Sequence, residues 1–362
     1  MTKYYCTQCF RNEKVIEYIK KQNLIGSCSF CESTEVNIAS AEDAFWFDLI
    51  ISFDFLRASP DNRGFTLERF LTRQVDLLSE TVSHQTRIEI INNLFHLMLY
   101  SLDINLLHNP DQKFVANFKG TSALEKKWEE FKKQIKHTNR FGFDIDEKLK
   151  TNLVTILTNN KKTLNKGTEF YRARLGKPKG SRTFPYEEDQ VMAPPKEIVS
   201  EGRINPRGVS YLYVTDDINT AIAEVRPYKG TEVSLATVQI IEDIEITSFN
   251  NTNYHGKSLH EQTELYILTN TINYELSYPI DEQAKYLDYI PYQYISELAK
   301  HLGLEGLEYK SALEEGTNLC IFNTKKVMWK SGELYKIKNL KVEAEPVNQP
   351  ITDATFSFDL EW

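Results

Sequence analysis

The spacing of apolar residues changes character near residue 160. Before this point, apolar side chains recur every three or four positions, which is the spacing of amphipathic helices. Helices are expected over residues 45–56, 70–78, 88–98, 123–137 and 146–157. The polar segment 159–167 then interrupts the helical pattern and marks a boundary.

Beyond this boundary the apolar positions alternate, as they do in half-buried strands. Strands are expected over residues 168–174, 209–214, 233–240 and 318–322, with short helices and long polar loops between them. This half is therefore expected to be a mixed α and β domain. The last stretch, 341–362, is acidic, and its one apolar alternation leaves open whether it is a docked strand or a loose tail.

Composition narrows the class of protein. The 362 residues are 41% hydrophobic and 12% aromatic, which is ample for folded cores, and the net charge is −8. A dedicated nucleic-acid binder carries an overall positive field, so nucleic acid is not an expected partner and any bound anion must be held locally. The most apolar run, 44–56, is too short to span a membrane and contains Asp48 and Asp54. We expect a soluble, cytoplasmic protein with no membrane contact.

Two tight cysteine pairs lie at the N-terminus, Cys6 with Cys9 and Cys28 with Cys31. Each C-x-x-C turn lets two sulfurs converge on one tetrahedral ion, so the spacing predicts a four-thiolate Zn²⁺ site. Redox dithiols or four unrelated cysteines are the alternative. Residues 1–38 hold five Lys or Arg against four Glu, a local charge of only +1. This favours a structural metal over a phosphate-tracking finger.

The expected strand 168–174 carries two arginines on one face, Arg172 and Arg174, because side chains alternate along a strand. A guanidinium fixed on a strand can bind a pyrophosphate through two parallel hydrogen bonds. A surface ion pair is an equally good interpretation of either arginine alone. Tyr211 and Tyr213 share a face of the next strand, where an aromatic ring could stack on a flat heterocycle, although core packing is the usual explanation.

The helix expected after this strand begins with Thr215 or Asp216 as its N-cap and ends before Pro227. Its buried stripe leaves Glu224 on another side of the helix. A single glutamate in such a position is usually solvated, so Glu224 gains interest only from its surroundings.

In combination, these pieces resemble the RES domain family, which is named for its Arg, Glu and Ser. The resemblance covers the second half of the chain, and five motifs occur in the family order. They are Tyr171-Arg172-Ala173-Arg174; Gly202-Arg203 with Asn205-Pro206 and Gly208; Leu212-Tyr213 with Ala221 to Glu224; Tyr289-Ile290-Pro291 with Gln293 and Glu297; and Gly306-Leu307 with Tyr309-Lys310-Ser311, Gly316 and Asn318 to Phe322. The chain departs from the family in Ile204, where an aromatic is usual, and in Lys310, where proline is common. The loops 176–200 and 246–275 are also long.

The resemblance implies a fold similar to ADP-ribosyltransferases and the consumption of NAD, often by the toxin of a bacterial toxin–antitoxin pair. It implies that Glu224 stabilises the oxocarbenium-like charge that develops on the ribose, and that Arg172 pairs with the pyrophosphate. Tyr213 would stack on the nicotinamide or position the ribose, and Ser311 would donate a hydrogen bond in the same cleft. Further substrate contacts are expected from Arg174, Arg203, Asn205, Tyr211 and Asn318. For Arg203, bracing of the turn at Asn205 is an equal alternative.

Other chemistries are less well supported. Cys320 lies in a buried-strand pattern, which favours a structural thiol. Neither a P-loop nor a dinucleotide-binding glycine fingerprint occurs, so NAD would be a substrate and not a bound hydride carrier. The N-terminal half looks like the HEPN-type region sometimes fused to RES domains. Arg87 and His96 are too far apart for the ribonuclease motif of HEPN proteins, so this half is expected to mediate assembly or to restrain the enzyme.

The sequence therefore predicts an α+β protein in four parts. These are a four-Cys zinc module (1–38), a helical HEPN-like domain (39–162), a RES catalytic domain (163–340) and an acidic extension (341–362). The first functional hypothesis is NAD cleavage by hydrolysis or phosphorolysis, in a toxin or defence effector. Transfer of ADP-ribose to a macromolecule and a non-enzymatic zinc adaptor are the alternatives. An inhibitory antitoxin or regulatory protein and a homo-oligomer are the expected partners.

Overall fold

A computed structural model defines the fold, and it divides the chain into two units that are described separately. The first unit comprises the described residues of Met1–Lys126 and Asn253–Leu268, and the second those of Lys127–Thr252 and Thr269–Asn348. The described residues are 2–51, 53, 56–59, 64–96, 99, 106, 108–116, 122–141, 145–181, 185–250, 254, 257–278, 285–311 and 313–340. The expected acidic extension, 341–362, therefore lies outside the described residues. No helix within these ranges is long and apolar enough to cross a membrane.

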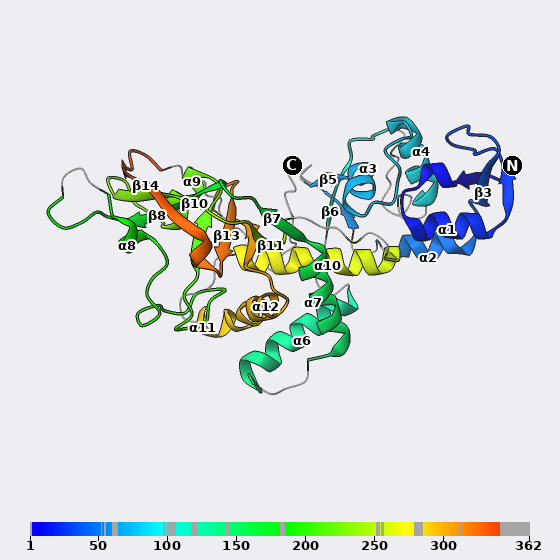
Figure 1. Cartoon of the computed structure of the whole chain (residues 1–362). Helices are drawn as coiled ribbons and strands as arrows, with labels where there is room; N and C mark the ends of the chain where they lie inside the picture. Colours follow the sequence, from blue (N-terminus) through cyan, green and yellow to red (C-terminus); the bar gives the residue numbers. More distant parts are fainter. Residues whose placement is uncertain are drawn as a thin grey trace, which may run out of the picture. The chain divides into compact units, whose positions relative to one another are not determined.

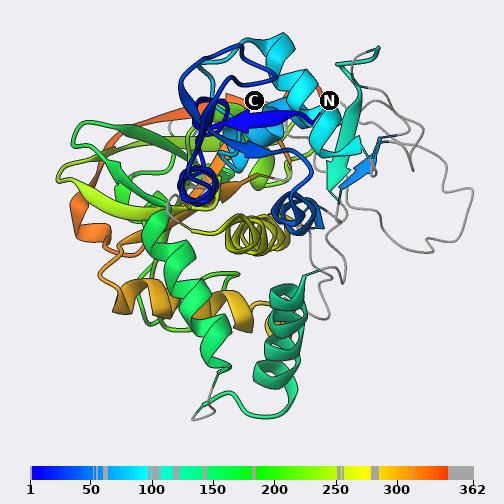
Figure 2. The same ribbon diagram turned by 90° about the vertical axis from the view of Figure 1, so that its right-hand side faces the viewer.

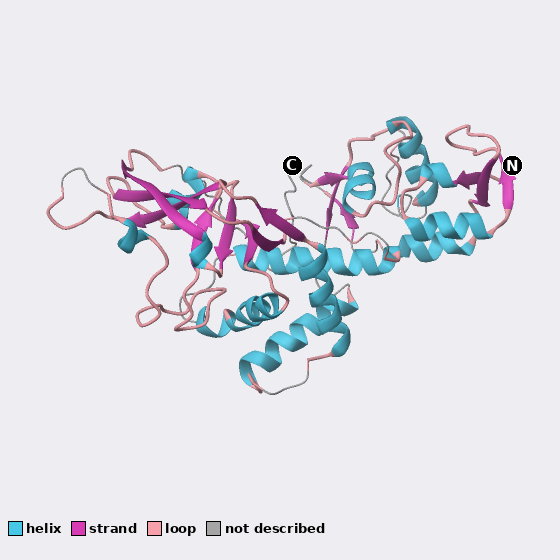
Figure 3. Cartoon of the chain, viewed as in Figure 1, coloured by secondary structure: helices cyan, strands magenta, loops and turns pink. Residues whose placement is uncertain are grey.

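The first unit contains two small antiparallel sheets and short helices (Figure 3). Its first sheet has the order β1-β3-β2 and its second the order β4-β6-β5. The strands are β1 (Tyr4–Cys6), β2 (Leu24–Gly26), β3 (Val36–Ser40), β4 (Leu56–Ala58), β5 (Phe65–Thr66) and β6 (Lys113–Ala116). The helices are α1 (Glu13–Lys21), α2 (Ala44–Ile51), α3 (Leu67–Arg69) and α4 (His84–Leu94), together with a 3-10 turn at Thr7–Cys9 and a π-helix at Phe70–Gln74.

One apolar core runs through this unit and includes the cysteines. Cys6 and Cys9 are fully buried in the same cluster as Trp46 and Phe70. Aromatic rings dominate the packing; for example, Tyr5 stacks on Phe30 with centroids 4.9 Å apart. The expected helix 45–56 ends earlier, because Leu56 pairs in β4 with Ala116 of β6. The sequence pattern predicted a helical domain over residues 39–162, but the described part of this region also contains the strands β4, β5 and β6.

The second unit is built on an eight-stranded sheet with the order β14-β10-β8-β9-β13-β12-β11-β7 (Figure 1). Neighbouring strands are antiparallel except for β11 and β12. The strands are β7 (Lys161–Leu164), β8 (Glu169–Leu175), β9 (Leu212–Thr215), β10 (Glu232–Ile240), β11 (Ile244–Ser248), β12 (Gly306–Lys310), β13 (Thr317–Ile321) and β14 (Val327–Lys336). All four strands expected from alternation are present, and the fold is α+β.

The helices of the second unit are α6 (Ala123–His137), α7 (Glu147–Asn159), α8 (Glu188–Val191), α9 (Ile218–Glu224), α11 (Lys285–Asp288) and α12 (Ile290–His301). α9 packs against β8, β9 and β10, and α12 packs against β12 and α7. The half-buried carboxylate of Glu275 joins three helices, because it accepts hydrogen bonds from Trp128 on α6 and Tyr292 on α12, both at 2.9 Å.

Helix α10 (Leu259–Ser277) contributes residues to both units. Figure 1 shows this helix along its length, and Figure 2 shows it nearly end-on. Its N-terminal half places Tyr266 and Ile267 in the core of the first unit. Its C-terminal half brings Glu275 to the second unit, where this residue contacts α6 and α12.

Candidate functional site

Two polar side chains, Ser311 and Asn318, meet at Glu224, the last residue of α9. Ser311, directly after β12, donates its hydroxyl to Glu224 Oε1 at 2.9 Å. Asn318 on β13 donates its amide nitrogen to the same oxygen at 2.7 Å. Among the described residues, Oε2 of Glu224 has no hydrogen-bond partner, and the side chain is exposed. The carboxylate is thus fixed through one oxygen and open at the other.

Local interactions fix the start of α9 against the sheet and so determine where its last residue lies. Asp217 caps the helix by accepting from the Thr220 backbone amide at 2.8 Å, one or two residues later than the caps expected from sequence. The neighbouring Asp216 accepts from the backbone amide of Thr317 at 2.7 Å and so ties the start of α9 to β13. A Cβ on Gly316 would lie 2.2 Å from Thr220 Oγ1, so only glycine permits this close approach.

Tyr213 on β9 is held by the loop that precedes its strand. Its hydroxyl donates to Asn205 Oδ1 at 2.8 Å and accepts from the Ile204 backbone amide at 3.3 Å. Burial raises the pKa of Tyr213 well above its ordinary value, so its phenol stays protonated. Asn205 is itself buried and donates to the carbonyl of Ser200 at 2.9 Å. Asn205 is therefore a brace for Tyr213 and for the loop.

Helix α12 holds the same loop in place. Gln293 donates to the carbonyls of Gly202 and Asn205, at 3.0 and 3.3 Å. The buried Ser296 hydroxyl donates to the carbonyl of Ile204 at 2.8 Å. The family motif around Pro291 contains Gln293, but sequence reasoning gave it no role. Ser296 was missed, because a serine three residues further along a helix carries no signal of its partner.

Arg172 lies where the sheet is weakly joined. In the described part of the sheet, β8 and β9 pair at a single position, Tyr171 with Thr215. The Nη1 atom of Arg172 donates to the carbonyl oxygen of Tyr213 at 2.9 Å, beside this junction. Burial lowers the pKa of the Arg172 guanidinium, and the like charge of Arg174 lowers it further. The group nevertheless stays charged at neutral pH, because an arginine titrates far above it.

Strand register connects Tyr213 to the Glu224 cluster. On β13, Cys320 lies opposite Tyr213, and Asn318 lies opposite Thr215. Paired residues share a face of the sheet, as do residues two apart on one strand. Tyr213 and Asn318 are therefore on one face, about 7 Å apart along the strand direction. Arg172 contacts the backbone of Tyr213, Ser311 and Asn318 contact Glu224, and strand pairing between β9 and β13 places these two groups of contacts on neighbouring strands.

Three other residues expected to bind substrate have contacts elsewhere. Arg174 is exposed, lies over the Tyr186 ring at 4.9 Å and donates to the carbonyl of Gln190. Arg203 donates to the carbonyls of Glu275, Leu276 and Tyr278 at the end of α10. The buried Tyr211 donates to Glu297 of α12 at 3.2 Å and packs on Phe322. These contacts favour bracing roles for Arg203 and Tyr211.

Cys320 is buried in β13, as its sequence pattern predicts. Burial raises the pKa of its thiol far above the ordinary value, and the hydrogen bond to Tyr213 opposes that shift only in part. The neutral thiol is a poor nucleophile. It therefore belongs to the packing beneath Tyr213.

The four N-terminal cysteines form one cluster that could bind a metal ion. Their sulfur atoms all lie within 4.8 Å of one another, and the shortest separations are Cys6 to Cys31 at 3.4 Å, Cys9 to Cys28 at 3.6 Å and Cys6 to Cys9 at 3.7 Å. These distances exclude disulfides. Zn–S bonds of about 2.3 Å in a tetrahedron place the sulfurs about 3.8 Å apart, so the residues fit a zinc ion.

The thiols of this cluster perturb one another strongly. The contact with Cys28 raises the pKa of Cys6 above its ordinary value, and the contact with Cys6 lowers the pKa of Cys28. The thiols of this cluster therefore cannot all ionise together without a compensating cation. A divalent metal would supply that compensation.

Known proteins resemble parts of this chain. No curated protein matches the chain. Among solved structures, the chain is similar to the crystal structure of the M. tuberculosis MbcT–MbcA toxin–antitoxin complex, with 12% identity over 53% of this chain and 93% of that chain and a TM-score of 0.33. The HEPN-like resemblance of the N-terminal half is not confirmed. Residues 170–334, which hold Arg172, Tyr213, Glu224, Ser311 and Asn318, match the family model of the RES domain.

Proposed function

We propose that the chain degrades NAD by cleaving the bond between nicotinamide and ribose. The observation that carries this proposal is the arrangement at Glu224, where Ser311 and Asn318 both donate to Oε1 and leave Oε2 open. The match of residues 170–334 to the RES domain supports it, because the resemblance to this family implies the consumption of NAD. The proposal extends to a role as a toxin or defence effector.

The chemistry requires an anion beneath the ribose. As the glycosidic bond breaks, nicotinamide leaves with the bonding electron pair and positive charge develops on the ribose ring. Glu224 is an anion already oriented by two donors, so it stabilises this charge without further reorganisation. Water or phosphate then attacks the anomeric carbon and loses a proton, which gives ADP-ribose or its phosphorylated counterpart.

Arg172 and Tyr213 have complementary tasks in this proposal. One nitrogen of Arg172 is occupied by the carbonyl of Tyr213, and the remaining donors have no partner among the described residues. They would pair with the pyrophosphate of NAD. The Tyr213 hydroxyl is fixed by Asn205, so its ring has a defined orientation for contact with the nicotinamide or the ribose.

The direct test is Glu224→Gln, which keeps the size of the side chain and removes its charge. We expect the rate of nicotinamide release from NAD to fall on the order of 100-fold or more, because a preplaced charge is lost. Glu188→Gln is the matched control, since Glu188 is an exposed glutamate in α8, and it should keep full activity. Unchanged turnover in Glu224→Gln would remove the central residue of the proposal.

The products distinguish the alternatives. Incubation of the purified chain with NAD, with and without phosphate and cell extract, gives free ADP-ribose for hydrolysis and a phosphorylated sugar for phosphorolysis. Labelling of a macromolecule identifies an ADP-ribosyltransferase. Absence of nicotinamide in every condition favours a non-enzymatic zinc adaptor.

We also propose a structural Zn²⁺ at Cys6, Cys9, Cys28 and Cys31, and an inhibitory protein partner such as an antitoxin. The need for a partner follows from the proposed reaction, because unrestrained loss of NAD harms any cell. Expression of the chain alone should arrest growth of a bacterial host, and Glu224→Gln should relieve the arrest. If the purified chain cleaves NAD in vitro and cells that express it still grow normally, no inhibitory partner is needed. Sedimentation of the purified chain tests the expected homo-oligomer.

A further inference from the structure

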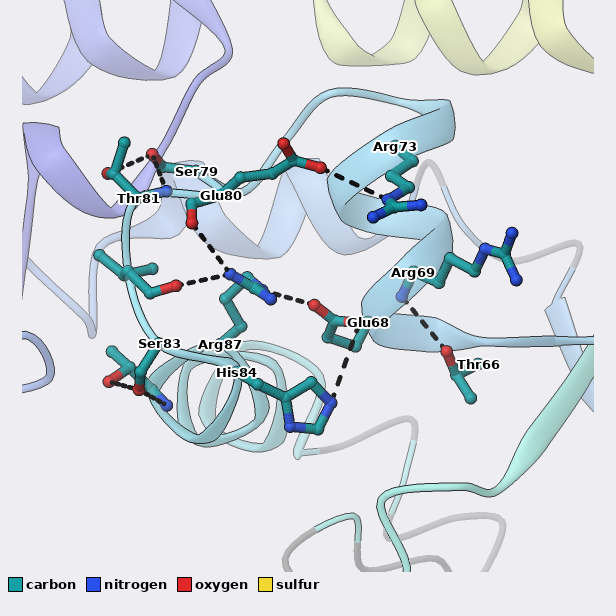
Figure 4. A network of polar contacts seen from close by, with 12 residues as sticks. Thr66, Glu68, Arg69, Arg73, Ser79, Glu80, Thr81, Ser83, His84 and Arg87 are labelled. Carbon is teal, nitrogen blue, oxygen red and sulfur yellow. Dashed lines mark hydrogen bonds and ion pairs between the residues drawn. The ribbon is translucent and has the colours of Figure 1, made fainter. Parts of the chain in front are cut away.

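The first unit contains a polar groove that the proposed NAD chemistry does not use. It has a volume of about 570 Å³ and lies between α3, the π-helix Phe70–Gln74, and the start of α4 (Figure 4). Small-molecule pockets typically span about 300 to 1,000 Å³, so the groove is large enough for a ligand. Its lining combines Arg69, Thr72, Arg73 and Arg87 with Glu68 and His84.

Thr72 is the first sign of a missing ligand. Thr72 is among the residues that line the groove, it is only 3% exposed, and its hydroxyl has no hydrogen-bond partner among the described residues. A buried hydroxyl is normally satisfied, because leaving it unpaired is costly. Thr72 also lies in the middle of a π-helix, a conformation that is rare and occurs frequently at functional sites.

Arg69 is the second sign. Its guanidinium makes no hydrogen bond or ion pair with any described residue, and Figure 4 shows it extending away from Glu68. Arg73, four residues further on, is 63% exposed and is joined to Glu80 at 3.4 Å. Arg87, in contrast, is committed to the fold, because it binds Glu68 and the carbonyl of Val82. Arg69 and Arg73 are therefore the two arginines available to a ligand.

The charges define the kind of ligand. Glu68 compensates Arg87, and Glu80 compensates Arg73, so Arg69 leaves an excess of one positive charge in the groove. This excess suits one phosphate group, and it is too small to attract a long polyanion against the net charge of −8. Guanidinium groups bind phosphate through paired hydrogen bonds, and a threonine hydroxyl can donate a further one.

We propose that this groove binds the phosphate group of a small molecule, with Arg69 and Arg73 pairing with its oxygens and Thr72 donating to it. Binding satisfies the buried hydroxyl and the unpaired guanidinium together. The site shares no residue with the Glu224 cluster, so it is independent of the proposed NAD cleavage.

Calorimetric titration of the full chain with inorganic phosphate and with AMP, in a phosphate-free buffer, tests the proposal. Adenosine, which lacks the phosphate, is the ligand control, and a short RNA distinguishes a nucleic-acid backbone from a small molecule. We expect saturable binding of phosphate or AMP at millimolar concentrations or below, and none of adenosine. Tighter binding of RNA through the same residues would overturn the small-molecule assignment.

Two variants localise the site. Arg69→Gln should weaken binding about tenfold, because a charge-assisted pair is lost, and Thr72→Val should weaken it without lowering the melting temperature. A purely structural hydroxyl would instead lower the melting temperature when it is removed. Arg140→Gln, at an exposed arginine elsewhere, should leave the affinity unchanged. The proposal is wrong if neither ligand binds saturably, or if both groove variants bind as the unaltered chain does.

Discussion

At the scale of single residues, the two hydrogen bonds to Glu224 Oε1 determine what this carboxylate can do. Ser311 and Asn318 come from the two ends of the connection between β12 and β13, so one loop orients the carboxylate at the end of α9. Neither donor touches the open Oε2. Each is therefore suited to positioning the anion for a reaction that takes place on its free side.

Substitutions at Asn318 test this positioning role. Asn318→Ala should lower kcat about tenfold with little change in KM, because a donor to the anion is lost. Asn318→Asp should be more damaging, since it places a second carboxylate 2.7 Å from Glu224 in place of a donor. Asn323 makes a similar contact with Glu305 at 2.8 Å, so Asn323→Ala is the matched control and should retain kcat. Equal kcat in Asn318→Asp and the unaltered chain would contradict the role.

Residue roles were only partly predictable from the sequence. The alternation predicts one shared face for Tyr211 and Tyr213, but it does not predict their partners, which are Glu297 of α12 for Tyr211 and Asn205 for Tyr213. The Oδ1 atom of Asn205 accepts from Tyr213 and its amide holds the loop, and its expected contact with substrate stays a prediction. These roles depend on partners that are distant in the sequence, and residue patterns in one sequence do not identify such partners.

At the scale of elements, periodicity predicted α6, α7 and four strands of the second unit, but it missed the longest described helix and strand. The expected long loop 246–275 overlaps α10, and β14 was not expected. α6 has the expected bounds, and α7 begins after the cap Asp146, whose carboxylate accepts from the Leu149 amide at 2.9 Å. Strands β4, β5 and β6 were not foreseen. They are two to four residues long, too short for a detectable alternation, and β4 pairs with a strand more than fifty residues away.

The family motifs predicted the composition of the Glu224 cluster better than periodicity did. Periodicity placed Glu224 away from the buried stripe of α9 and gave it no partner. The contacts with Ser311 and Asn318 depend on how the β12–β13 connection approaches α9 at Gly316. This approach follows from tertiary packing, so only the motif order could indicate it.

At the scale of the whole molecule, the cysteine cluster is a structural element of the first unit. Cys6, Cys9 and Cys28 belong to the same buried core as Trp46 and Phe70, so loss of a bound ion would disturb more than one loop. The metal and the apolar core should therefore fail together when the chain is heated.

We expect about one zinc ion per chain by elemental analysis, and none in Cys9→Ser, because three thiolates no longer close the tetrahedron. Chelation or Cys9→Ser should lower the melting temperature by about 10 °C, since ion binding contributes to folding. Cys320→Ala is the control for metal content and should keep the ion. An unchanged melting curve after complete removal of metal would exclude a structural role.

Helix α10 limits how this chain can be divided. The half of the helix that packs Tyr266 and Ile267 lies inside the span of the RES match, although those side chains complete the other unit's interior. A fragment of residues 170–334 would expose these apolar side chains to water and would be prone to aggregation. A gene rearrangement that separated the two units would also remove the apolar side chains of α10 from the first unit. We therefore expect the two units to be inherited together.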